Sequence, residues 1–138
     1  MVGYTSDRYL QFGWASARLD DIANWIPARL SAMCILIATI TYGKTRTQSA
    51  LVCMRQYAHT HNSPNAGYPE SVFAGGLQIA FGGKRYYPHI GEIDHWIGDN
   101  KQDITPKIMM AGIGLFNRSI YVAVAVFCVV LTYTLPTI

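Results

Sequence analysis

The apolar residues of the chain are concentrated in two runs that lie far apart in the sequence. Residues 119–135 form the longer run. It has 17 residues, and no acidic or basic side chain occurs after Arg118. As a helix it would extend about 25 Å, close to the roughly 30 Å of a bilayer core. Tyr121 and Tyr133 lie near its ends, where aromatic rings favour the membrane interface. The pattern predicts a membrane-spanning helix, and a buried helix or strand of a soluble core is the alternative.

The second apolar run, residues 30–42, is too short to cross a bilayer alone. Extended back to Ile26 it reaches 17 residues and then includes Arg29. It either spans the membrane within a bundle or enters only part of the way. Pro27 ends an aromatic helix expected over 4–25 and starts a new one, with Arg29 in its first turn.

Between the two runs, the spacing of apolar residues and the positions of glycine and proline predict five segments. These are a helix over 47–59, a loop over 61–67, a helix over 71–81 that Pro69 and Glu70 open and Gly82 and Gly83 end, an irregular stretch over 84–103, and an apolar segment over 104–116. The expected fold class is therefore all-α: a multi-pass integral membrane protein with interfacial helices and a polar loop region.

Composition and charge support this class. Half of the residues (51%) are hydrophobic and only 14% are charged, against about 25% in soluble proteins. A net charge of +3 without a basic stripe excludes a nucleic-acid partner. Residues 43–118 hold eight of the eleven basic side chains, so this polar region is expected on the cytoplasmic side.

A group of polar residues lies immediately before Pro27. Asp20, Asp21 and Asn24 fall within i, i+3 and i+4 spacing of a helix, so their oxygens share one face. Hard oxygen ligands suit Mg²⁺, which completes its shell with water and phosphate. The start of the next helix and Arg29 would receive the phosphate oxygens. The spacing fits either a magnesium–phosphate site or a capped helix with a surface salt bridge, which is the commoner arrangement.

A rigid turn, residues 63–70 with the sequence SPNAGYPE, leads into the helix expected over 71–81. It can hold Asn65 and Glu70 beside a ligand, with backbone N–H groups directed at an anion. Glu70 fits the role of a general base, a metal ligand or a partner of the helix dipole. A structural connector explains the same residues equally well.

Histidine and cysteine residues give weaker indications. The histidines fix no third metal ligand by their spacing; they are His59, His61, His89 and His95. The three cysteines share no short spacing, which excludes a disulfide framework or a zinc knuckle, and Cys53 is expected to be a small apolar filler.

Longer strings in the sequence carry a resemblance to a known family. They are MVGY at 1–4, FG at 12–13, ARLDD at 17–21, NWIPARL at 24–30, SPNAGYPE at 63–70, AG at 74–75, GG at 82–83 and IGD at 97–99. In this order they closely resemble the cobalamin-biosynthesis membrane proteins of the CobD/CbiB type. The resemblance covers nearly the whole chain, from Met1 to the final apolar helix.

The resemblance implies an activity and a location. Family members look like multi-pass inner-membrane adenosylcobinamide-phosphate synthases. They join aminopropanol, or its phosphate, to the propionate carboxylate of adenosylcobyric acid in an ATP-dependent amide synthesis. The implied partners are this corrinoid, the amine, ATP with Mg²⁺, and the lipid bilayer. The implied roles are catalytic for Glu70, Asp20 and Asp21, with the two aspartates also near Mg²⁺, and substrate or phosphate binding for Arg29, Asn24 and Asn65.

The chain also departs from the family pattern. Full members are about twice as long, and the resembling part is their C-terminal half. Residues 1–138 are therefore expected to be a single incomplete domain, either a fragment or a natural half that pairs with a separate N-terminal partner. Thr5 and Trp96 stand where a basic residue and a proline are expected. The alternative function is a non-catalytic membrane subunit that binds the corrinoid or scaffolds pathway enzymes; an ion or solute pathway is a third.

Overall fold

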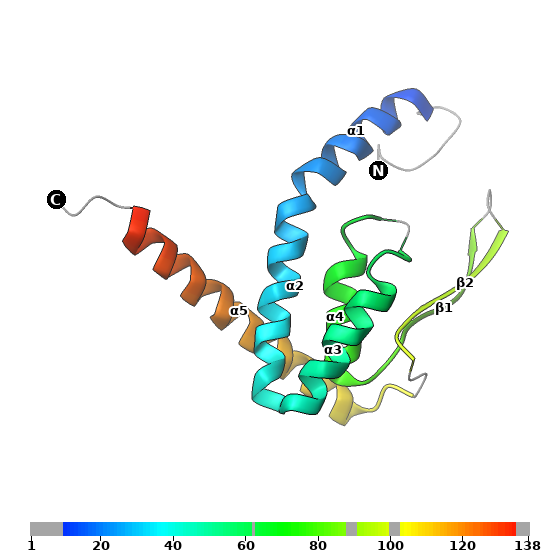
Figure 1. Cartoon of the computed structure of the whole chain (residues 1–138). Coiled ribbons are helices and arrows are strands. Elements are labelled where there is room, and N and C mark those ends of the chain that lie inside the picture. Colours follow the sequence, from blue (N-terminus) through cyan, green and yellow to red (C-terminus); the bar gives the residue numbers. More distant parts are fainter. Residues whose placement is uncertain (1–9, 62, 88–90, 100–102, 135–138) are drawn as a thin grey trace.

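The computed structural model of the chain describes residues 10–61, 63–87, 91–99 and 103–134. Helices predominate in this part of the chain, and one hairpin interrupts them (Figure 1). The elements in chain order are α1 (Leu10–Ala23), α2 (Trp25–Thr39), the 3₁₀ helix η1 (Ile40–Tyr42), α3 (Lys44–Tyr57), α4 (Gly67–Leu77), β1 (Phe81–Tyr87), β2 (Gly91–Ile97) and α5 (Pro106–Thr134).

The centre of the molecule is a group of closely packed helices. α3 and α4 lie side by side, and α2 packs against both α4 and α5. Figure 1 shows α5 crossing beneath these helices, with its C-terminal half extending away from them. Small side chains make up much of the buried core and let the helix backbones approach closely; they include Ala32, Ala38, Ala50, Ala58 and Ala74.

Two glycines bring α3 and α4 close together. A Cβ atom added at Gly75 would lie 2.6 Å from the Ala50 Cα and 2.6 Å from the Ser49 carbonyl oxygen. A Cβ at Gly67 would lie 2.2 Å from the Ala58 carbonyl oxygen. Because no other residue type fits at these distances, the glycines set the separation of the two helices and the position of the loop between them.

Tyr42, at the end of η1, joins α5 to the other helices. Its hydroxyl donates a hydrogen bond to the Ala111 carbonyl oxygen at 3.2 Å and accepts one from Arg118 Nη1. The Arg118 guanidinium also lies 4.5 Å from the centre of the Tyr42 ring, a cation–π contact. These contacts fix the first half of α5 beneath the helices.

Residues 81–97 contain a hairpin, in which β1 pairs antiparallel with β2 and Phe81 lies opposite Ile97. The expectation of an all-α fold with an irregular stretch over 84–103 is wrong for this segment. Aromatic residues favour strands, and Lys84 Nζ lies 2.9 Å from Glu92 Oε1 across the pair, which adds a cross-strand attraction. The glycines and charged residues of this segment suggested irregular structure and masked the strand preference of its aromatic residues.

The glycine pair that was expected to end a helix lies inside β1. Gly82 and Gly83 have φ angles of 133° and 123°, and a Cβ at Gly82 would come within 2.0 Å of the His95 carbonyl oxygen. The preceding helix ends earlier, at Leu77, where Gln78 adopts a left-handed conformation with φ of 57°. These glycines therefore permit strand contact and do not act as a helix stop.

The other helices differ from their expected bounds at the ends. The helix expected over 4–25 is observed as α1, and residues 4–9 lie outside the described part of the chain. Pro27 lies in the first turn of α2, which begins two residues earlier. The apolar segments expected over 104–116 and 119–135 are continuous in α5 up to Thr134, because the residues between them do not interrupt a helix.

Two helical stretches are long and apolar enough to cross a membrane. Trp25–Tyr42 has 18 residues and a mean hydropathy of 1.4, and Pro106–Thr134 has 29 residues, within which an 18-residue window has a mean hydropathy of 1.9. The helices pass this test by length and composition alone. Among the described residues, apolar helices therefore occur at both positions where the sequence predicts them.

The close approach at Gly75 leads to a stability prediction. Gly75→Ala forces a methyl group against the α3 backbone, so we expect it to lower the free energy of unfolding by about 1–3 kcal/mol. Gly112→Ala is the matched control, because its Cβ would meet nothing nearer than the flexible Leu77 Cδ1 at 3.4 Å. That change should be neutral or stabilising by up to about 1 kcal/mol. Unfolding in detergent, followed by circular dichroism, measures both, and equal stabilities for the two variants would contradict the prediction.

Candidate functional site

The residues before and after Pro27 meet the turn that precedes α4. Arg29 Nη1 donates a hydrogen bond to Asn65 Oδ1 at 2.9 Å and another to the Trp25 carbonyl oxygen at 2.8 Å. Asn65 Nδ2 in turn donates to the Asp21 carbonyl oxygen at 2.8 Å, near the end of α1. Arg29 and Asn65 are 36 residues apart, so the fold itself brings them together. We refer to Arg29, Asn65, Trp25 and Tyr68 as the Arg29 cluster.

The Arg29 guanidinium contacts two aromatic rings. It lies 4.2 Å from the centre of the Trp25 ring and 4.4 Å from the centre of the Tyr68 ring. Both contacts fix the orientation of its plane. The hydrogen bonds that Arg29 makes within the described residues use Nη1, so Nε and Nη2 can bind an anion. Sequence reasoning missed Tyr68, although it belongs to the SPNAGYPE turn.

The two acidic residues near the end of α1, Asp20 and Asp21, make different hydrogen bonds. Asp20 is exposed, and its Oδ1 accepts a hydrogen bond from Asn24 Nδ2 at 2.9 Å. Asp21 contacts the cluster through its main-chain oxygen rather than through its carboxylate. Asn24 is the residue at which α1 ends and α2 begins. Of the two aspartates, Asp21 is thus tied to the Arg29 cluster through its main chain, and the Asp20 carboxylate is bonded to Asn24.

Glu70 lies in the first turn of α4, near a group of imidazole rings. Its Oε2 is 3.9 Å from His61 Nε2, while His61 Nδ1 accepts a hydrogen bond from the Ser63 N–H at 2.9 Å. The His95 ring stands nearly at right angles to that of His61, with the ring centres 6.3 Å apart. The contact that places Glu70 is therefore with a histidine.

The histidines do not form a metal centre in the described part of the chain. No group of three or more histidine, cysteine, aspartate or glutamate side chains there is placed to hold a metal ion. His59 instead packs edge-on against Tyr68, with the ring centres 5.4 Å apart. His89 lies outside the described residues.

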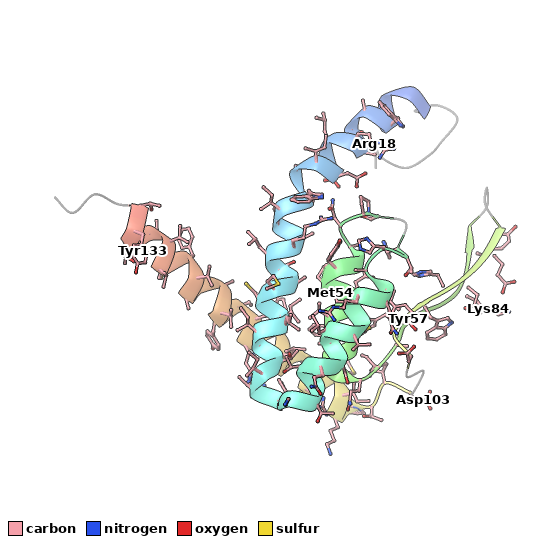
Figure 2. The ribbon with its side chains drawn as sticks, in the orientation of Figure 1. Arg18, Met54, Tyr57, Lys84, Asp103 and Tyr133 are labelled. Carbon is pink, nitrogen blue, oxygen red and sulfur yellow. The ribbon has the colours of Figure 1, made fainter. Side chains whose placement is uncertain are left out.

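A hollow lies between α3, α4 and the end of β2. Its volume is about 510 Å³, and its lining includes Cys53, Gly75 and Asp99. The Tyr57 hydroxyl donates a hydrogen bond to the Asp99 carboxylate, and Figure 2 shows Tyr57 on the side of α3 nearest the hairpin. Burial, and then the Asp99 charge, raise the pKa of the Cys53 thiol to about 11. The buried, free thiol agrees with the expected role of Cys53 as an apolar filler.

The Arg29 cluster has the chemical properties of an anion site. A fixed guanidinium with N–H donors that make no hydrogen bond among the described residues suits phosphate or carboxylate oxygens, and its two ring contacts reduce its exposure to water.

Known proteins that match the chain belong to one family. The model of the CobD/Cbib protein family matches residues 1–116. Cobalamin biosynthesis protein CobD of Rhodobacter capsulatus is 38% identical over 119 residues, which cover 86% of this chain and 36% of the relative. The protein of the same name from Mycobacterium tuberculosis is 38% identical over 133 residues, 96% of this chain and 42% of the relative.

Another relative matches a shorter region at higher identity. Cobalamin biosynthesis protein CobD of Brucella anthropi is 50% identical over 88 residues, 63% of this chain and 27% of the relative. The chain therefore spans about two fifths or less of the length of these relatives. No solved structure matches it.

The bridging position of Asn65 leads to a prediction about α1. Asn65 is buried, and Asn65→Ala leaves the Asp21 carbonyl oxygen and the Arg29 side chain without this partner. We expect a loss of about 1–3 kcal/mol of stability and faster hydrogen exchange in residues 21–29. Asn117→Ala is the matched control, because Asn117 is exposed on α5. Unchanged exchange in residues 21–29 of the Asn65 variant would contradict the bridge.

The raised pKa of Cys53 predicts an unusual pH dependence. In a Cys34→Ser, Cys128→Ser background, alkylation of Cys53 should keep rising with pH until about pH 11, whereas the unfolded chain should level off near pH 9. Because the fold favours the neutral thiol, the associated stability is complete below pH 9 and is lost as the pH rises through 11. Rates that level off near pH 9 in the folded protein would show that Cys53 is not buried.

Proposed function

The chain belongs to the CobD/Cbib protein family, and on this basis we propose that it takes part in cobalamin biosynthesis. More specifically, we propose that it contributes to the ATP-dependent formation of an amide bond. This reaction joins aminopropanol or its phosphate to adenosylcobyric acid and gives adenosylcobinamide or its phosphate. The single observation that supports the finer proposal is the fixed guanidinium of the Arg29 cluster.

Amide formation from a carboxylate requires activation of that carboxylate. The carboxylate oxygen is a poor leaving group until it is phosphorylated, and phosphoryl transfer depends on cationic groups around the phosphates. Arg29, in cation–π contact with Trp25 and Tyr68, has two nitrogen atoms that can donate to phosphate oxygens. In this proposal Arg29 binds ATP phosphate, and Asn65 keeps the guanidinium in place.

The acidic residues of α1 fit a magnesium ion that the nucleotide brings. Mg²⁺ commonly takes one or two protein carboxylates and completes its shell with phosphate and water, so a preformed site of three protein ligands is not required. The proposal is supported by the Asp21 main-chain contact with Asn65 of the Arg29 cluster and by the hydrogen bond between Asn24 and Asp20 one turn of helix away. When bound, Mg²⁺ would neutralise phosphate charge. Asp20 and Asp21 would hold it there.

Glu70 is the residue that we assign to proton transfer. An amine must lose a proton as it attacks the activated carboxyl group, and a nearby carboxylate or imidazole can receive it. Glu70 lies beside His61 in the first turn of α4, at the end of the SPNAGYPE turn that also supplies Asn65. The amine is therefore expected to bind on the Glu70 side of the cluster.

We also propose that the chain is a multi-pass protein of the cell inner membrane. The apolar stretches Trp25–Tyr42 and Pro106–Thr134 support this location. Residues 43–118, which hold most of the basic side chains, would then face the cytoplasm, where ATP is available. Because Asn65 of this region contacts Arg29 at the start of α2, this orientation requires α2 to enter the membrane only part of the way. Because the chain spans about two fifths of its relatives, the complete reaction is expected to need the part that it does not match.

Reconstitution tests the proposed reaction. The chain is placed in lipid vesicles with adenosylcobyric acid, aminopropanol phosphate and Mg-ATP, with and without the unmatched part of the Rhodobacter capsulatus relative as a second chain. Product that requires both chains supports the proposal. Tight corrinoid binding without product in either case would instead support a non-catalytic membrane subunit. Vesicle flux that changes in Asp20→Ala or Arg29→Ala, without ligation, would support a solute pathway.

Substitution of Arg29 gives the corresponding kinetic prediction. Arg29→Ala should lower the rate of product formation by about 10²-fold or more, because it removes a fixed charge from the phosphate site. Arg29→Lys should recover little of this rate, since an ammonium group neither stacks between two rings nor binds two oxygens in one plane. Arg55→Ala, which removes an exposed basic residue from the last turn of α3, is the control and should retain full activity. Full activity in the Arg29→Ala variant would contradict the assignment.

A further inference from the structure

One face of α2 has a regular stripe of large apolar side chains that touch little else in the described structure. Along the Trp25–Tyr42 stretch these side chains are between 42% and 62% exposed. They are Ile26, Leu30, Met33, Ile37 and Ile40. Successive members are four, three, four and three residues apart, and the stripe runs for about 21 Å along the helix. We call these five residues the α2 stripe.

A spacing of alternating fours and threes is the pattern of a helix–helix seam. Apolar residues repeated in this way form the knobs that pack into holes on a neighbouring helix. The opposite face of α2 is already occupied, since Ala32, Ala38 and Thr39 are buried against other parts of the molecule. The α2 stripe therefore has the geometry for a second helical neighbour.

The distal, C-terminal half of α5 has a different kind of exposed apolar surface. There, exposed apolar residues follow one another around the whole helix, as at Val129, Val130 and Leu131. An apolar surface on all sides is typical of a helix in contact with lipid. On α2 the exposed stripe is narrow, because Cys34 and Leu36, which border it on its two sides, are partly buried. A narrow exposed stripe of this kind suits one neighbouring helix better than lipid.

A hollow lies next to the C-terminal end of the α2 stripe. It has a volume of about 400 Å³ and is formed between α2 and α5, where Ile37 and Ile40 face Tyr121 and Val122. A space of this size can receive large side chains from a neighbouring helix. The stripe and the hollow together form a continuous apolar surface that a single helix could cover.

We propose that the α2 stripe packs against an apolar helix from the part of a family-length protein that this chain does not match. The matched regions make up 36% and 42% of two relatives, so about three fifths of each relative lies outside them. This inference rests on family membership, and it does not require the proposed ligation. It goes beyond the proposed function because it identifies the surface through which the two parts associate.

Photo-crosslinking in vesicles tests this surface directly. The photoreactive amino acid p-benzoylphenylalanine replaces Leu30 or Ile37, and the chain is reconstituted with the unmatched part of the Rhodobacter capsulatus relative as a second chain. Both variants should form adducts with that second chain. The same replacement at Arg55, exposed on α3, is the control and should not. Replacement of Phe127, on the distal half of α5, should give lipid adducts.

The possible products separate the alternatives. Adducts between two copies of this chain would overturn the proposal in favour of self-association, and lipid adducts alone at Leu30 and Ile37 would show that the stripe faces the bilayer. As a second test, Leu30→Glu should reduce co-purification with the partner chain at least tenfold, whereas Arg55→Glu should not. Circular dichroism confirms that the exposed Leu30 variant retains its helices. None of these readouts depends on amide synthesis, so a failure of the proposed reaction leaves them unaffected.

Discussion

The candidate site depends on the side-chain amide of Asn65. The last carbonyl groups of a helix lack partners within that helix, and the break between α1 and α2 leaves such groups next to the turn before α4. Asn65 satisfies one of them, the Asp21 carbonyl oxygen, with its amide nitrogen, and uses its amide oxygen to hold Arg29. One buried amide thus joins the end of α1, the start of α2 and the turn before α4. A longer or purely donating side chain could not make both contacts from this position.

The position of Asn65 depends in turn on the packing of α3 against α4. Gly75 allows the two helices to approach at one end, and Gly67 allows the start of α4 to lie against the Ala58 carbonyl oxygen. These two close contacts fix the turn between the helices, and the turn supplies Asn65, Tyr68 and Glu70. Two glycines of the α3–α4 contact therefore determine where the charged groups of the site meet.

Sequence reasoning reached much of the helical framework but little of the tertiary geometry. Pro27 and the apolar runs locate α2 and α5, because helix starts and long apolar segments are local features. The hairpin was missed because the glycines of 81–97, with their positive φ angles, look like helix breakers when neighbouring strands are unknown. Asn65 and Arg29 could each be named as candidates from the sequence. That one would hold the other, and that Tyr68 would stack on the guanidinium, depends on contacts across 36 or more residues.

The Arg29 cluster and the α2 stripe are two features of the same helix, and this has a physical consequence. The stripe begins at Ile26, three residues before Arg29, so a helix packed along it would end within one helical turn of Arg29. Removing water from this end of α2 would lower the local dielectric constant and strengthen the attraction between Arg29 and a phosphate. On this account the chain holds the charged groups of the anion site in place, and its neighbour supplies the exclusion of water that makes those charges effective. The need for a second part would then follow from electrostatics as well as from the length of the relatives.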